Sequence, residues 1–137
     1  MSQEPNNAQP FDILKELYET QLKDQTQQRG YDFDNMSLKE RADYVKLFVL
    51  MVEDELHEML HELPYFKPWK RYDNVDVREQ MSKVYGEFAD VIHFFLNVMI
   101  GIDMTPEMLY EVYKEKHWIN GERLKDTSQY KPDTEAD

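Results

Sequence analysis

The chain has 137 residues, of which 41% are hydrophobic and 32% charged, and its formal net charge is −12. This length and hydrophobic content suit one folded domain and exclude a disordered chain, and the negative charge argues against nucleic acid as a partner because duplex binding needs a basic face. Cysteine is absent, which excludes disulfides, thiolate metal sites and cysteine nucleophiles.

The ends of the chain are polar. We expect disordered tails over residues 1–10 and 131–137, on either side of a folded domain at residues 11–130. The N-terminus has neither the basic start nor the apolar run of a signal peptide. The longest apolar stretch, residues 91–100, is about half as long as a membrane span. These features predict a cytoplasmic protein with no membrane partner.

The first half of the domain has helical periodicity, because glycine is scarce (4 residues) and no segment alternates as a strand would. A first helix is expected over residues 11–29, ended by Gly30. A second begins at a capping box of Ser37 and Glu40 and runs to about Glu62. Its apolar positions recur at spacings of three and four and predict a buried stripe of Leu38, Ala42, Val45, Val49, Val52, Leu56, Met59 and Leu63.

Two more helices follow in the second half. The third is expected over residues 76–100, with Gly101 as its C-terminal cap. Beyond Ala89 it is apolar nearly all round, which predicts a central buried helix. The fourth should cover residues 106–124, because Thr105 followed by proline is a strong helix start. The surplus of apolar residues on the second and third helices suggests that protomers pair.

Two pairs of carboxylates are candidates for chemistry: Glu55 with Glu58 in the second helix, and Glu87 with Asp90 in the third. A spacing of three places each pair on one helix face. Four facing carboxylates in a partly buried cleft cannot all stay ionised unless a cation joins them. Oxygen ligands without cysteine favour Mg²⁺ or Mn²⁺ over zinc. The alternative is a solvated face, since the chain has 28 acidic residues.

The histidines offer a rival metal site. Glu58 with His61, and Asp90 with His93, have the carboxylate–histidine spacing of di-iron helical bundles. Such bundles take a carboxylate from each of two further helices, and neither the first nor the fourth helix offers an acid in an apolar stripe. His93 either orients Asp90, touches a substrate or is a satisfied core histidine.

Two further groups of residues suit a phosphorylated ligand. The loop at residues 64–75 combines aromatic side chains with cations, which can cover a base while holding phosphates; the alternative is a hydrophobic plug that anchors the loop. The fourth helix carries a polar stripe that by itself is also a solvated face. The residues concerned are Lys67, Trp69 and Lys70 in the loop, and Lys116, Asn120 and Arg123 in the helix.

Taken in order, these motifs resemble the all-α NTP pyrophosphatase superfamily, in its dimeric dUTPase and phage dCTPase branch, which is related to MazG. The segments that carry the resemblance are Glu55-Leu-His-Glu58, Phe66-Lys-Pro-Trp-Lys70, Glu87-Phe-Ala-Asp90-Val-Ile-His93-Phe94 and Lys116-His-Trp-Ile-Asn120-Gly-Glu-Arg123. Each motif is weak alone, whereas the ordered set, over roughly residues 11–130, is specific. One departure is Leu124, which stands where the family usually continues with a glutamine-containing motif.

The resemblance implies a four- to five-helix bundle, assembled as a homodimer or higher homo-oligomer. It implies hydrolysis of dUTP, dCTP or both to the monophosphate and pyrophosphate, with Mg²⁺ (or Mn²⁺) bound by the four acids, one of which activates water. Such an enzyme controls nucleotide pools, and a phage-encoded member would act in the host cytoplasm. The implied substrate-binding residues are Gln21 (with Gln25 in reserve), Lys67, Trp69, Lys70, His93, Lys116, Asn120 and Arg123.

Two alternatives are kept beside this interpretation. The first is a MazG-like pyrophosphatase that prefers purine or mixed deoxynucleoside triphosphates. The second is an acidic helical interaction protein without catalysis, whose charge mimics DNA. A magnesium titration separates the second from an enzyme, because an adaptor should gain no thermal stability from Mg²⁺ and a nucleotide.

Overall fold

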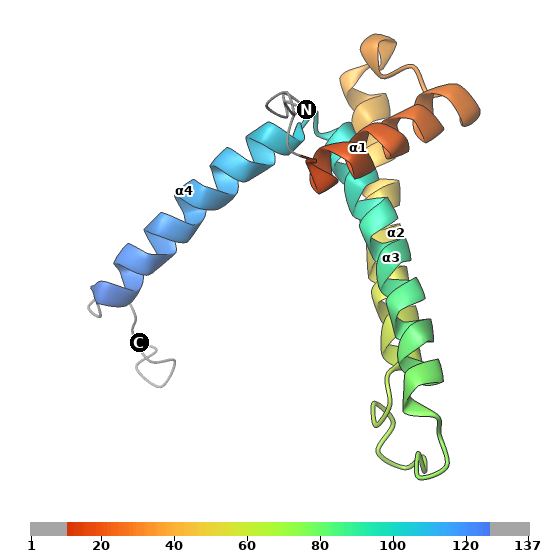
Figure 1. Ribbon diagram of the computed structural model, residues 1–137. Coiled ribbons are helices and arrows are strands. Elements are labelled where there is room, and N and C mark those ends of the chain that lie inside the picture. Colours follow the sequence, from red (N-terminus) through yellow and green to blue (C-terminus); the bar gives the residue numbers. More distant parts are fainter. Residues whose placement is uncertain (1–10, 127–137) are drawn as a thin grey trace, which may run out of the picture. The chain divides into compact units, whose positions relative to one another are not determined.

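The computed structural model describes residues 11–126, and within that range it is helical without a strand (Figure 1). The predicted all-α fold is therefore confirmed, while both predicted tails, residues 1–10 and 131–137, lie outside the described residues. The chain forms two compact units, divided between Asp103 and Met104. The elements are α1 (Ile13–Lys23), the π-helix η1 (Asp24–Gln28), the 3-10 helix η2 (Phe33–Asn35), α2 (Leu38–Glu62), α3 (Val77–Gly101) and α4 (Pro106–Lys125).

The first unit is built on a long hairpin of α2 and α3, which run side by side and are joined at one end by the loop at residues 63–76 (Figure 1). α1 packs on α3 near the other end of the hairpin. Among the described residues of this unit, the buried apolar side chains come from α2 and α3: Tyr44, Phe48, Val52, Val84, Val91, Leu96, Met99 and Ile100. The site described below lies where α1 meets the hairpin.

The helix starts follow local chemistry. The Ser37 side chain accepts from the Glu40 N–H while Glu40 reaches back, so the predicted capping box at α2 is confirmed. Thr105 caps α4 by accepting from the Met108 N–H, with proline at the first turn, also as predicted. Asp76 caps α3. Such signals are local in the chain, which is why the predicted helix bounds lie close to the observed ones.

Gly101 was expected to cap α3, and this prediction is wrong. Gly101 is the last residue of α3, and Ile102 follows as the cap. A Cβ atom at Gly101 would lie 2.7 Å from Val45 Cγ2 and 2.9 Å from Tyr44 Cδ1. The glycine therefore allows α2 and α3 to approach closely. Gly30 does end a helix as expected, with a φ of +77° just after η1.

Arg41 fastens this end of the hairpin. Its guanidinium donates to the carbonyl oxygens of Gly101 at 3.1 Å and Phe33 at 2.7 Å, and more distantly to that of Ile100. The last carbonyls of a helix have no partner within the helix. Arg41 thus satisfies carbonyl groups at the end of α3 and links α3 to η2. These bonds hold together the part of the hairpin on which α1 packs.

Burial follows the predicted stripes only in part. Leu38 and Val49, expected in the α2 core, are exposed, whereas Tyr44 and Phe48 are buried. The second half of α3 is not buried all round either, since Phe95 remains 47% exposed. By length and composition α3 would suffice to cross a membrane, but the core helix of a soluble protein passes the same test, and α3 is the central helix of this unit.

α4 makes up the described part of the second unit, Met104–Asp126. Most of its side chains are exposed, including the large rings of Tyr110, Tyr113 and Trp118. Tyr113 stacks on His117 with ring centroids 6.2 Å apart. The assignment of residues 11–130 to a single domain stays a prediction.

Candidate active site

Three carboxylates gather on one face of the α2–α3 hairpin. Glu55 of α2, Glu87 and Asp90 of α3 each offer an oxygen, and these oxygens lie within 4.8 Å of one another. The spacing of three residues puts Glu87 and Asp90 on one side of α3, and α2 brings Glu55 across to them. We call these residues the acidic triad.

The surroundings of the triad favour a bound cation. Burial raises the pKa of the Glu55 carboxyl, and a hydrogen bond with Glu87 and repulsion by Asp90 raise it further. A divalent cation among the three carboxylates would relieve this repulsion. The donors are all oxygen, which fits a hard ion such as Mg²⁺ or Mn²⁺. The residues present therefore suit a divalent metal.

Glu58 is the fourth predicted ligand, and it lies outside the triad. It follows Glu55 on the same helix, but its side chain is exposed. The structure thus brings three of the four predicted acids together. A role for Glu58 in metal binding stays a prediction.

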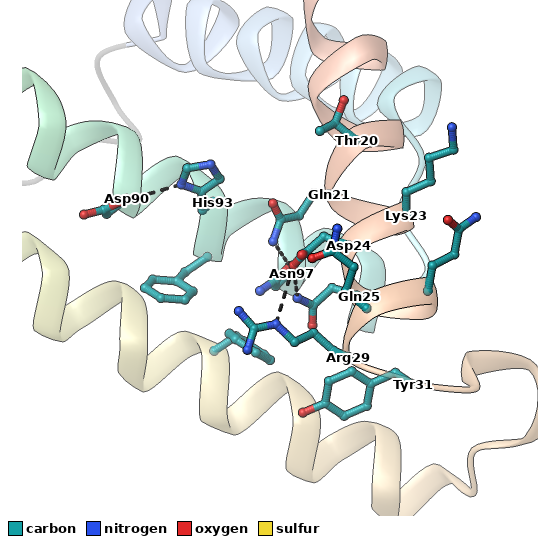
Figure 2. A pocket seen from close by; sticks show the side chains of 14 residues that line it. Thr20, Gln21, Lys23, Asp24, Gln25, Arg29, Tyr31, Asp90, His93 and Asn97 are labelled. Atoms are coloured by element: carbon teal, nitrogen blue, oxygen red, sulfur yellow. Dashed lines mark hydrogen bonds and ion pairs between the residues drawn. The ribbon is translucent and has the colours of Figure 1, made fainter.

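An open pocket of about 760 Å³ adjoins the triad at Asp90 (Figure 2). His93 lies beside Asp90 at its mouth, with Nδ1 3.7 Å from Oδ1 of the carboxylate. Since the His93 side chain is 60% exposed, it is not a core histidine. Further in, the rings of Phe48 and Phe94 stack with centroids 5.8 Å apart and form an apolar wall.

The opposite wall of the pocket is made of amides from α1 and η1. Gln21 is buried and donates from Nε2 to Oδ1 of the buried Asn97 at 2.8 Å, and the two side chains point toward one another in Figure 2. Gln25, one turn along, is also buried and accepts a hydrogen bond from the Tyr44 hydroxyl at 2.9 Å. The π-helical turn η1 follows directly; such turns are frequent at functional sites.

Asn97 is the main pocket residue that the sequence analysis missed. It is a lone amide in the apolar second half of α3, four residues after His93. That position, one helical turn from a site histidine, is a signal that could have been used. Phe48, Phe94, Tyr31 and Arg29 also line the pocket, and nothing in their spacing distinguishes them from core or surface residues.

The predicted loop residues do not line this pocket. Lys67, Trp69 and Lys70 lie in the loop that precedes α3, whose first residue is Val77. At 1.5 Å per residue, Val77 is about 20 Å along the helix from Asp90, the pocket residue nearest to it in the chain. Trp69 is 80% exposed, so it is not a buried plug. Among the described residues, the cations that line the pocket are Lys23 and Arg29.

The remaining predicted residues belong to the second unit. The side chains of Lys116, Asn120 and Arg123 are exposed on α4. Their spacing places them along one side of that helix, as expected from the sequence. Their roles in substrate binding stay predictions.

Comparison with known proteins gives one result. A family model described as dUTPase matches residues 13–108, a span that includes the whole acidic triad and every residue that lines the pocket. No curated protein and no solved structure matches the chain.

Proposed function

The chain belongs to the all-α dUTPase family, and we propose that it hydrolyses dUTP to dUMP and pyrophosphate with Mg²⁺, and dCTP more slowly. Membership makes it a nucleoside triphosphate pyrophosphatase, a class that generally depends on a divalent metal. The observation that carries the proposal is a pocket that adjoins the acidic triad at Asp90 and has a wall of buried amides.

At the triad end, Glu55, Glu87 and Asp90 would hold the metal, with Glu58 as an additional ligand. A divalent ion bound there would neutralise the triphosphate and lower the pKa of an attacking water. Lys67, Lys70, Lys116 and Arg123 are proposed to contact phosphates on the strength of the family motifs, and Trp69 and Asn120 to contact the nucleotide. His93, at the pocket mouth beside Asp90, is placed to touch the substrate near the reacting phosphate.

At the other end, the Gln21–Asn97 pair is proposed to read the base. Because one amide donates to the other, the pair presents one free acceptor and one free donor to the pocket. If both amides rotate together, their mutual hydrogen bond is kept and the free donor and acceptor exchange places. Uracil and cytosine each offer an adjacent donor and acceptor, so the pair suits both, while Phe48 and Phe94 give a ring an apolar surface.

The test is a panel of deoxynucleoside triphosphates assayed for pyrophosphate release by the full chain in Mg²⁺. We expect dUTP to give the highest kcat/KM, dCTP the second, and the purines lower values, because a larger base should not bring its hydrogen-bonding edge to the Gln21–Asn97 pair. Gln21→Ala should reduce the difference in kcat/KM between the pyrimidine and the purine triphosphates. Faster turnover of dGTP or dATP than of both pyrimidines would establish the MazG-like alternative. Release from none of the four would favour the acidic interaction protein.

We also propose that the protein assembles as a homodimer through α3. Apolar residues recur on this helix at alternating spacings of four and three, the pattern of a coiled-coil seam. Several of them face solvent: Tyr85 is 67% exposed, Phe88 50% and Phe95 47%. A second copy would cover this seam, whose members are Met81, Tyr85, Phe88, Ile92 and Phe95.

A further inference from the structure

Tyr44 lies outside the pocket but contacts three of the residues that line it. Its hydroxyl donates to Gln25 Oε1 at 2.9 Å. Its ring centroid lies 4.9 Å from that of Tyr31 and 4.6 Å from that of Phe48. Gln25, Tyr31 and Phe48 all line the pocket, and Tyr44 does not. A buried side chain so placed can position the wall of the pocket without touching the ligand.

The direction of the Tyr44 hydrogen bond follows from the neighbours of Gln25. Gln25 Nε2 lies 3.1 Å from Asp24 Oδ2, and an ionised carboxylate only accepts. The nitrogen of the amide must therefore face Asp24, which turns its oxygen to Tyr44 and makes the hydroxyl the donor. Burial raises the pKa of Tyr44, so the hydroxyl keeps its proton near neutral pH.

This arrangement fixes the Gln25 amide in one orientation. Its oxygen is occupied by Tyr44, and one of its two N–H groups by Asp24. The second N–H is left as a donor for a ligand, while the oxygen, which keeps a second lone pair, is turned toward Tyr44. Gln25 thus differs from the Gln21–Asn97 pair, in which joint rotation of the amides exchanges donor and acceptor while the mutual hydrogen bond is kept.

We propose that Tyr44 is a positioning residue that makes the site prefer uracil over cytosine, by holding Gln25 as a donor toward a carbonyl oxygen of the base. This inference rests on the proposed function and deepens it. Uracil carries carbonyl oxygens at C2 and C4, whereas cytosine has an amino group, itself a donor, at C4. The C2 oxygen is common to both bases, so a fixed donor distinguishes them at C4, where it bonds to the uracil oxygen and opposes the cytosine amino group; C4 is therefore the position that Gln25 is proposed to face.

The test compares Tyr44→Phe, Gln25→Met and the double variant, with kcat and KM measured for dUTP and dCTP. In Tyr44→Phe the ratio of kcat/KM for dUTP to that for dCTP should fall by about 5- to 10-fold, the effect expected of one hydrogen bond. The change should lie in the KM for dUTP, with kcat nearly unchanged. Gln25→Met should lower the ratio by a similar factor, and it leaves Tyr44 in place if Tyr44→Phe folds poorly.

The double variant separates positioning from packing. If Tyr44 acts through Gln25, adding Tyr44→Phe to Gln25→Met should change the ratio no further. Val84→Ala, which removes buried volume from the hairpin away from the pocket, is the control for lost stability and should keep the wild-type ratio. The inference is overturned if Tyr44→Phe lowers the dUTP to dCTP ratio of kcat/KM by the same factor in the wild type and in Gln25→Met. It is also overturned if Tyr44→Phe leaves the ratio unchanged. Wild-type protein that hydrolyses neither nucleotide overturns the proposed function instead.

Discussion

Glu55 differs from the acidic residues around it on α2 in its surroundings. Glu53, Asp54 and Glu58 are exposed, while Glu55 is half-buried and its oxygen lies within 4.8 Å of oxygens of Glu87 and Asp90. Burial and these neighbours raise its pKa, so the ionised form is disfavoured until a cation joins the group. A bound divalent cation would relieve the repulsion among the three carboxylates.

Replacing a member of the acidic triad should remove activity without unfolding the protein. Glu55→Gln, Glu87→Gln and Asp90→Asn should each lower kcat/KM for dUTP by about a hundredfold or more. The melting temperature without metal should change little, because repulsion is relieved as a ligand is lost. The rise in melting temperature that millimolar Mg²⁺ gives the wild type should disappear in each variant. Steady-state kinetics and thermal denaturation with and without Mg²⁺ measure both effects.

Glu58→Gln is the informative comparison in the same series. If Glu58 is a metal ligand, its substitution should lower kcat/KM as much as the triad substitutions do and should abolish the rise in melting temperature with Mg²⁺. If Glu58 is an exposed residue outside the site, its substitution should leave kcat/KM and the Mg²⁺-dependent rise in melting temperature near the wild-type values. Near wild-type turnover in any two of the triad variants would contradict the metal site itself.

At the scale of the elements, the sequence predicts helix ends better than it predicts which face of a helix is covered. Caps such as Ser37 and Thr105 act through bonds to neighbouring residues, so their effect can be seen in the chain alone. Periodicity identifies an apolar stripe but not the element that covers it. On α2 the core lies at Tyr44 and Phe48, toward η2 and α3, and Val49 is left exposed.

The same distinction applies to the site. On α3, the spacing of Glu87 and Asp90 within one helix indicated that they share a face. The same spacing on α2 also selected Glu58, which lies outside the triad, because spacing does not show which side of α2 faces α3. The partnership of Gln21 with Asn97 joins side chains far apart in the chain, and it exists only because α1 packs on α3. Gln21 could be proposed from the family motifs, whereas Asn97 could not be derived without that packing.

The close contact of α2 with α3 at Gly101 gives a prediction about the hairpin. In Gly101→Ala the new Cβ would lie 2.7 Å from Val45 Cγ2 and 2.9 Å from Tyr44 Cδ1, so these two side chains or the helices that carry them must shift. We expect a loss of about 1–3 kcal/mol in the free energy of unfolding, measured by urea denaturation. KM for dUTP should also rise, because Tyr44 contacts pocket residues.

Gly86→Ala is the matched control on the same helix. No atom lies within 4 Å of a Cβ built at Gly86, so alanine costs nothing in packing there. Its higher helix propensity should raise the free energy of unfolding by about 0.5–1 kcal/mol. Equal effects of the two substitutions would contradict the packing explanation for Gly101.

At the scale of the first unit, α3 has three sides with different neighbours. One side packs on α2 through Val84 and Val91, a second meets α1 at Asn97, and the third is the exposed apolar seam. The first two sides form the triad and the pocket. An exposed apolar stripe of this length is unusual for a monomer, and it supports the proposed dimer.

Disrupting that seam should therefore separate the protomers. We expect the wild type to have twice its chain mass of 16.6 kDa in size-exclusion chromatography with light scattering, and Phe88→Glu/Phe95→Glu to have the single mass, because two charges cannot be buried unpaired between apolar helices. Leu38→Glu, at a side chain that is 86% exposed and outside the seam, should remain a dimer. The triad lies on α2 and α3 of one protomer, so a folded monomeric variant should keep its Mg²⁺-dependent thermal shift. A monomeric wild type at micromolar concentration would contradict the proposed dimer. A variant of unchanged mass would place the interface on another surface.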